Sequence, residues 1–157
     1  MTSCASGGEL SRVVCGWLYR GRARSERDPR LHRHARVDLV SIRPKRLGRS
    51  AARLLRDADS GRAEILIPAI VAIELTLLRE AGRNVVGVPQ LEALVATKPA
   101  FALLPLDLRQ AGEFILVGTL EDPFDRLVVA AARAAGAPLV TSDTGIEESA
   151  LVETIWD

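Results

Sequence analysis

Three carboxylates between residues 121 and 145 have the residue type and spacing to do chemistry. Asp122 and Asp125 flank Pro123 at the start of an apolar segment, and Asp143 follows a later apolar run. Ligands of an α/β sheet bind outside the carboxyl ends of its strands. We therefore expect Asp143, at a strand end, and Asp125, at a helix start, to face one crevice. There they either hold a metal or cap helices.

Capping is the simpler explanation for each acid taken alone. An Asp at the N-cap, a Pro at the first helical position and an acid at the third form a start resembling a capping box, as in Asp122-Pro-Phe-Asp125. Acids also suit the positive end of the helix dipole. Asp143 precedes Gly145, a composition typical of a turn. The individual contexts favour structural roles about two to one for Asp122 and Asp125.

Glu74 is a lone carboxylate in the apolar run from Ile67 to Leu78. It lies either on a narrow solvated stripe or in a site, because a buried charge needs a partner. Glu74, Asp125 and Asp143 together suggest a cation, since clustered carboxylates raise one another's pKa unless a cation joins them. Carboxylate oxygens suit Mg²⁺ or Mn²⁺, which can activate water for displacement at phosphorus.

The elements that must position these acids alternate along the chain. Periodicity predicts helices over 47–57, 69–81, 88–97, 107–117 and 123–136. Apolar runs predict strands over 64–68, 101–106, 138–141 and 151–156. Because these strands lack polar alternation, the fold class is α/β, with a parallel sheet covered by helices on both faces.

The first 36 residues show no such periodicity. We expect them to be a basic, mostly disordered extension with at most a short helical turn over 13–19, followed by a strand over 37–42. Residues 1–49 hold 12 of the 21 Lys and Arg and 4 of the 20 acids, a net charge of +8. Residues 50–157 hold 9 basic and 16 acidic residues, a net of −7. A nucleic-acid arm, a disordered leader and a wrongly translated segment all fit this split.

Composition excludes several classes of protein. The 157 residues suffice for one domain with a real core, and 48% are hydrophobic. No apolar run approaches the length of a membrane span, and the start lacks the apolar core of a signal peptide. Cys4 and Cys15 form neither a disulfide framework nor a zinc pattern. A cytoplasmic protein is expected.

Four motifs follow one another along the chain: IPAIVAIEL from Ile67, LLPLD from Leu103, DPFDRLVVAA from Asp122 and LVTSD from Leu139. In this order they resemble the PIN-domain ribonucleases, most of all the VapC-type toxins of toxin–antitoxin pairs. The resemblance implies a PIN-like three-layer α/β/α sandwich with a central parallel sheet over residues 37–157. It also implies a Mg²⁺ (or Mn²⁺)-dependent endoribonuclease acting on structured RNA such as tRNA or rRNA. A cognate VapB-type antitoxin and a homodimer follow from the same likeness.

Carried over residue by residue, Glu74, Asp125 and Asp143 match three of the family's four acids, and Asp122 matches an accessory acid. The fourth acid normally ends the first strand, in an Asp-Thr-His or Asp-Ser-Ser context. No such motif is present, and Asp38, in the middle of Val37-Asp-Leu-Val, is the nearest substitute. The chain is therefore either an active ribonuclease or a PIN-fold module that binds antitoxin or RNA without cleavage. A phosphoryl-accepting receiver domain fits less well, because neither Lys45 nor Lys98 follows a candidate strand.

One back-translation bears on the missing motif. Arg33 to Asp38 can be encoded as CGA CAC GCA CGT GTG GAC, and a shift of one nucleotide then gives Asp-Thr-His-Val-Trp. The hypothesis is that residues 1 to about 43 arise from a frameshift or a misassigned start.

Overall fold

The computed structural model describes residues 17–21 and 47–157. The strand expected over 37–42, Asp38 within it, both cysteines and the rest of the basic segment lie outside the described residues. The boundary expected at residue 37 therefore remains a prediction.

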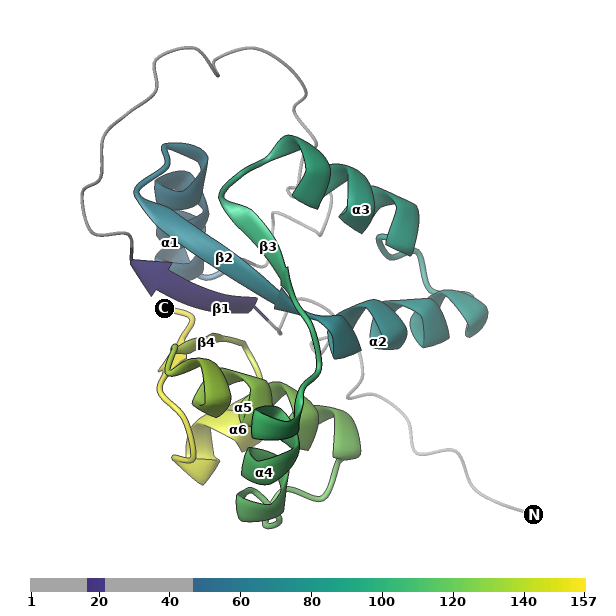
Figure 1. Ribbon diagram of the computed structural model, residues 1–157, viewed down its shortest axis with the longest axis vertical. Helices are drawn as coiled ribbons and strands as arrows, with labels where there is room; N and C mark the ends of the chain where they lie inside the picture. The colour runs from purple at the N-terminus through teal and green to yellow at the C-terminus, as the bar shows by residue number, and fades with distance from the viewer. Residues whose placement is uncertain (1–16, 22–46) are drawn as a thin grey trace.

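From residue 47 onward the helices and strands follow the expected order, with the short helix α6 in addition (Figure 1). The strands are β1 (Trp17–Gly21), β2 (Ala63–Pro68), β3 (Phe101–Leu104), β4 (Leu139–Val140) and β5 (Thr154–Ile155). The helices are α1 (Arg49–Asp59), α2 (Ala69–Glu80), α3 (Val88–Thr97), α4 (Leu108–Leu116), α5 (Pro123–Ala135) and α6 (Thr144–Ser149). Every helix and strand predicted between residues 47 and 157 is present.

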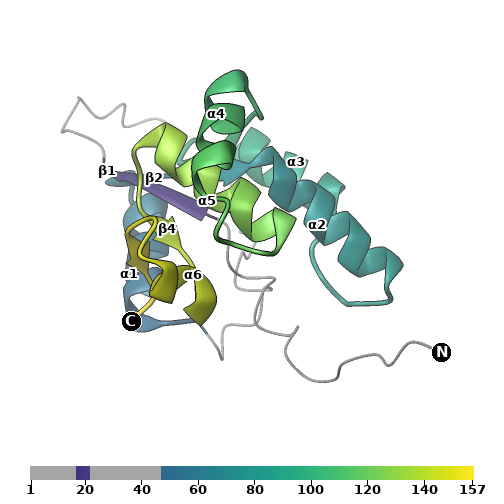
Figure 2. The ribbon, with the colours of Figure 1, turned by 90° about the horizontal axis from the view of Figure 1, so that it is seen from below.

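Three layers make up the fold. The sheet has the order β3-β2-β1-β4-β5. Seen from below, α1 and α6 lie on one side of the sheet, while α2 and α5 lie on the other and α4 is outermost (Figure 2). Residues 128–132 of α5 are all buried, as are both residues of β4, so α5 forms the centre of the core. The predicted α/β sandwich is confirmed.

The central strand β1 differs from expectation. It pairs antiparallel with both neighbours, placing Leu18 opposite Leu66 of β2 and Leu139 of β4. The sheet is therefore mixed, because the β2–β3 and β4–β5 pairs are parallel. The helical turn considered over 13–19 is wrong at Trp17, which with Leu18 is buried in the strand. A strand of five residues that lies in the sheet between β2 and β4 can bury two apolar side chains and hydrogen-bond to both neighbouring strands. It is nevertheless too short to show a periodicity in the sequence.

The ends of α5 match their sequence signals. Asp122 is its N-cap and Pro123 its first residue, while Gly136 ends it in the left-handed conformation at φ 60°. The short helix α6 was not predicted, because only Ile146 of its six residues is buried and six residues cannot display a helical period. None of the helices within residues 17–21 and 47–157 has the length and apolarity needed to cross a membrane.

Candidate functional site

Asp122 and Asp125 lie at the start of α5, and their roles differ. One carboxylate oxygen of Asp122 accepts hydrogen bonds from the backbone N–H of Phe124 at 2.8 Å and of Asp125 at 3.2 Å. The predicted capping by Asp122 is thus confirmed. Asp125 is half-buried in the first turn that this cap fixes.

Asp143 is also a cap, although of a helix rather than a turn. Its Oδ1 accepts from the N–H groups of Gly145 at 2.9 Å and Ile146 at 3.1 Å, which begins α6. The N–H of Asp143 donates to the hydroxyl of Thr141 at 3.0 Å, and Thr141 is buried. The backbone of Asp143 is therefore held at the end of β4.

Topology brings these acids and Glu74 to one edge of the sheet. Both β2 and β4 run antiparallel to β1, so their carboxyl ends lie at the same edge. The half-buried Glu74 lies on α2, which begins directly after β2 and packs against α5. Since α5 precedes β4 and is joined to it by the short turn 136–138, its first residues return to the end of β4. Glu74, Asp125 and Asp143 thus come from three segments that meet at this edge.

The donor chemistry of these residues suits a hard divalent cation, which prefers carboxylate oxygens. Within the described ranges, however, no group of three or more His, Cys, Asp or Glu side chains is arranged to hold a metal ion. Asp38, the remaining predicted ligand, lies outside the described residues. The assignment of Glu74, Asp125, Asp143, Asp122 and Asp38 to a metal site remains a prediction.

The antiparallel direction of β1 has a consequence for this edge. A parallel strand would end there and could place an acid at its carboxyl end, whereas β1 brings its amino end. Its first residue is the buried Trp17, opposite Val140 at the end of β4. The described central strand therefore supplies no acid to the predicted site.

Arg126 has a role that its position beside Asp125 does not reveal. Its guanidinium carbon lies 4.0 Å from the centroid of the Phe114 ring, and its Nη2 donates to the Phe114 carbonyl at 3.0 Å. The side chain therefore joins the first turn of α5 to the last turn of α4. Nothing in the sequence singles out Phe114 as the neighbour of Arg126.

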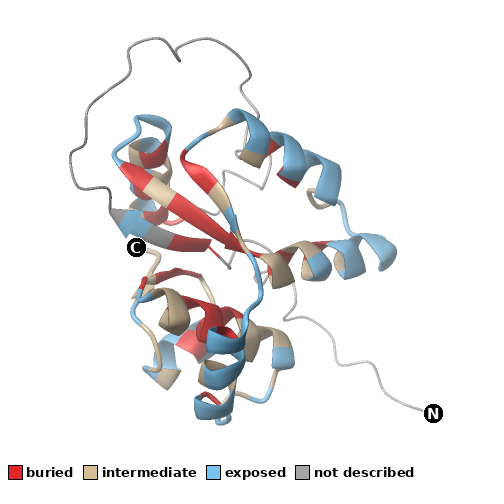
Figure 3. Cartoon of the chain, viewed as in Figure 1, coloured by how far each residue is buried: buried red, intermediate tan, exposed pale blue. Residues whose placement is uncertain are grey.

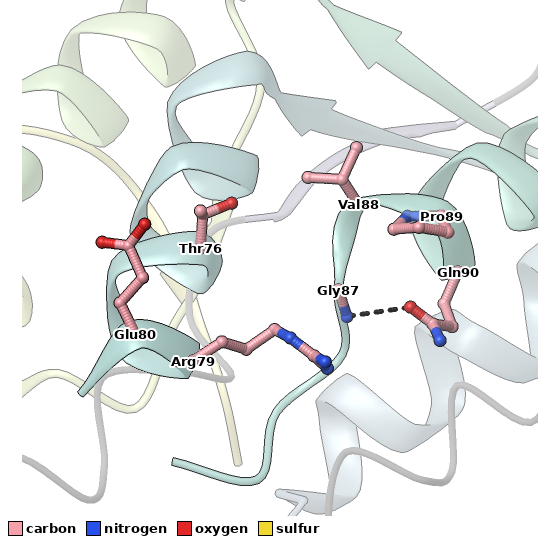
Figure 4. A pocket seen from close by; sticks show the side chains of 7 residues that line it. All are labelled: Thr76, Arg79, Glu80, Gly87, Val88, Pro89 and Gln90. Atoms are coloured by element: carbon pink, nitrogen blue, oxygen red, sulfur yellow. Dashed lines mark hydrogen bonds between the residues drawn. The ribbon is translucent and has the colours of Figure 1, made fainter. Parts of the chain in front are cut away.

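A hollow of about 470 Å³ lies elsewhere, between α2 and α3 (Figure 4). Beside it, the Gly87 N–H donates to the side-chain oxygen of Gln90 at 3.1 Å, and Arg79 donates to the Val85 carbonyl at 3.0 Å. This hollow is lined by none of the predicted site acids, which are Glu74, Asp122, Asp125 and Asp143. The hollow is therefore not the predicted acidic site.

Comparison with protein families gives one match. The profile of the PIN domain matches residues 33–150, a range that contains Asp38, Glu74, Asp125 and Asp143 but not β1. No curated protein matches the chain. PIN domains are generally nucleases, which hydrolyse phosphodiester bonds, and they typically use divalent metal ions. The match covers most of the chain and agrees with its α/β sandwich, so this chain belongs to the PIN-domain family.

Proposed function

We propose that the chain is a metal-dependent endoribonuclease of the VapC toxin type, acting in the cytoplasm on structured RNA. The observation that carries this proposal is that the segments bearing Glu74, Asp125 and Asp143 meet at one edge of a PIN-family sheet. All three side chains are half-buried.

The chain's own residues would prepare this edge. Glu74, Asp125 and Asp143 would hold a Mg²⁺ or Mn²⁺ ion, with Asp38 as the candidate fourth ligand. Asp122 fixes the turn that presents Asp125, and Thr141 holds the backbone of Asp143. Such an ion, when bound, supplies a Lewis acid and an activated water for hydrolysis at phosphorus.

Cleavage of a transfer RNA pool, with Mg²⁺ or with a chelator, tests the proposal. We expect cleavage by the parent chain in Mg²⁺ alone. Asp125→Asn should be slower by roughly 100-fold or more, the usual loss when one preorganised charge is removed from a site. Glu92→Gln is the matched control, because Glu92 is an exposed carboxylate on α3. Equal cleavage by the parent and Asp125→Asn would show that the site is assigned wrongly.

Two partners belong to the proposal. A VapB-type antitoxin would neutralise the toxin, and two copies of the chain would form a homodimer. Both rest on the likeness of Asp122-Pro-Phe-Asp-Arg and Leu139-Val-Thr-Ser-Asp to VapC motifs. Co-expression of this chain with the antitoxin encoded beside it, followed by co-purification, tests the first partner.

The second candidate function is a PIN-fold module that binds antitoxin or RNA without cleaving it. The direction of β1 favours this candidate, because the central strand places Trp17 rather than an acid at the site edge. Fewer carboxylates leave more of a dication's charge uncompensated, so metal affinity falls. RNA retained by the chain in Mg²⁺ without any cleavage would support the binding module over the nuclease.

The frameshift hypothesis is a further part of the proposal. The PIN match begins at residue 33, while β1 at 17–21 lies outside it and runs against the other strands. The direction of β1 supports an altered segment there, whereas the match already includes residues 33–43 as they stand. The gene's nucleotide sequence tests the idea directly, and a version recoded to begin with the Asp-Thr-His frame should cleave RNA faster than the parent. If the other frame encodes no strand followed by Asp, the hypothesis is wrong.

A further inference from the structure

Helix α1 divides its residues between two sides. Its inner side contributes three buried residues to the core, which are Ala51, Leu54 and Ala58. Its outer side carries three exposed arginines, which together form the arginine stripe: Arg49, Arg53 and Arg56. Spacings of four and three residues place these side chains on one face of the helix, along about 10 Å of its axis. The stripe is therefore a continuous row of positive charge.

The charge of the arginine stripe is not neutralised by its neighbours. Across residues 17–21 and 47–157, none of its three guanidinium groups forms an ion pair. The two acids of α1 have other partners, because Asp57 contacts Arg62 and Asp59 contacts Lys98 at 2.7 Å. The stripe is thus available to an anion from outside the chain.

The stability of α1 does not account for the whole stripe. Arg56 lies in the last turn, where a cation suits the negative end of the helix dipole. Arg49 is the first residue of the helix and lies at the positive end, where a cation is unfavourable. The backbone N–H of Arg49 is already bound by the Asp157 carboxylate at 3.1 Å. The charge of the Arg49 side chain therefore points to a role outside the helix.

The start of α1 lies at the same edge of the sheet as the segments that carry the predicted site acids. Strand β5 is parallel to β4, so both strands end at this edge. The carbonyl of Trp156, directly after β5, accepts the N–H of Ala51 at 3.2 Å. A Cβ on Gly48 would lie 2.1 Å from this oxygen, so only glycine permits the approach. Helix α6, which begins after Asp143, lies on the same side of the sheet as α1 (Figure 2).

The direction of α1 determines where the stripe leads. Residues 60–62 join the end of α1 to the beginning of β2, which is at the opposite edge of the sheet. The stripe therefore begins with Arg49 at the edge where the acidic segments meet, and Arg56 is its most distant member. A linear ligand bound along the stripe would have one end at the predicted acidic site.

We propose that the arginine stripe binds the phosphate backbone of RNA and holds the strand so that it extends from the acidic edge along α1. Guanidinium groups form paired hydrogen bonds with phosphate and stay charged at physiological pH. A row of three such groups fits a chain of phosphates better than it fits one small anion. The choice of RNA over an acidic protein rests on the proposed ribonuclease function.

Binding of fluorescently labelled transfer RNA, measured by anisotropy in EDTA, tests the inference without any cleavage. Arg53→Gln should weaken binding and lower the slope of log K against log salt by about 1, the value for one lost phosphate contact. Replacing all three arginines of the stripe with glutamine should lower the slope by about 2–3 and weaken binding roughly tenfold or more. Arg53→Lys should keep most of the slope, because it keeps the charge.

Arg109→Gln is the matched control for Arg53→Gln. Arg109 is an exposed arginine of α4, a helix that is mostly exposed in Figure 3 and lies on the other side of the sheet from α1 in Figure 2. Its loss changes the net charge equally and should leave the slope near that of the parent. Thermal unfolding of each variant shows whether its fold is intact.

Four results would overturn the inference. They are a parent that does not bind transfer RNA in EDTA, a folded triple variant with the slope of the parent, and an equal loss of slope in Arg109→Gln. The fourth is a triple variant that loses affinity for polyglutamate but not for RNA, because the stripe would then serve an acidic protein.

Cleavage kinetics in Mg²⁺ separate the stripe from the nuclease proposal. Arg53→Gln should raise KM more than it changes kcat, since a contact to distant backbone is made equally in the ground state and the transition state. If the parent does not cleave RNA at all, the ribonuclease proposal fails, while the binding measurements in EDTA still decide whether the stripe holds RNA.

Discussion

At the residue scale, two of the candidate site acids also begin helices. Asp122 accepts two backbone N–H groups of α5, and Asp143 accepts two of α6. Each of these bonds uses Oδ1. Capping therefore does not exclude ligation, because a carboxylate has a second oxygen and several lone pairs. The two explanations offered by the sequence are compatible at these positions.

Asp122→Ala should lower the free energy of unfolding by about 1 kcal/mol, the usual cost of losing a helix cap. For a chain of this size the melting temperature would fall by about 2–4 °C. Glu121→Ala is the control, because Glu121 is exposed and gives α5 no cap. Circular dichroism melts of both variants check the prediction. Equal melting of Asp122→Ala and the control would mean that the cap adds nothing.

At the element scale, β1 is the strand on which the sheet depends most. It lies between β2 and β4, and Leu18 is fully buried where it faces Leu66 and Leu139. Leu18→Ala should therefore destabilise the chain by about 2–5 kcal/mol, the range for a Leu truncated inside a core. Arg20→Ala should cost far less, because Arg20 is half-exposed and its contact with Glu64 is 3.9 Å long. Denaturant unfolding measures both values. If Leu18→Ala leaves the free energy of unfolding unchanged, another segment occupies the centre of the sheet.

Helix α4 gives a prediction about the stability of the chain. Gly112→Ala should stabilise the monomer by about 0.5–1 kcal/mol, because alanine is the better helix former and its Cβ meets open space. Denaturant unfolding of the parent and Gly112→Ala measures the difference. A variant less stable than the parent would show that glycine is needed at this position.

The elements that the sequence predicted share a clear signal, and those it missed are short. Helix α5 combines Asp122, Pro123 and Gly136 with a buried apolar face, so its position and both ends were predictable. Helix α6 and strand β1 are too short to repeat a period. The direction of β1 was beyond sequence reasoning, because Trp17 and Leu18 suit either direction and only the neighbouring strands decide. For the same reason the placement of Arg126 on Phe114 could not be predicted.

At the scale of the whole molecule, the charge split and the fold coincide. The acidic part of the chain forms all the described elements except β1, and the basic part lies almost wholly outside the described residues. The carboxyl ends of β2 and β4 gather acids from α2, α5 and the start of α6 at one edge. Helix α4 lies on the outside of α5, away from the sheet (Figure 2). The proposed catalytic edge and helix α4 are thus joined through α5.

The acids at this edge give a prediction about the stability of the whole chain. A ligand that binds only the folded state stabilises it by RT ln(1 + [L]/Kd), which is about 1.4 kcal/mol at ten times Kd. If Glu74, Asp125 and Asp143 bind one divalent cation, Mg²⁺ at that concentration should raise the melting temperature of the parent by about 3–5 °C. Asp125→Asn should show little of this rise, while Glu92→Gln should keep all of it. NaCl at equal ionic strength separates binding from screening of surface charges. If the melting temperature rises equally in the parent and in Asp125→Asn, the Mg²⁺ effect arises elsewhere on the molecule. If it does not rise in the parent, the binding module without catalysis is favoured.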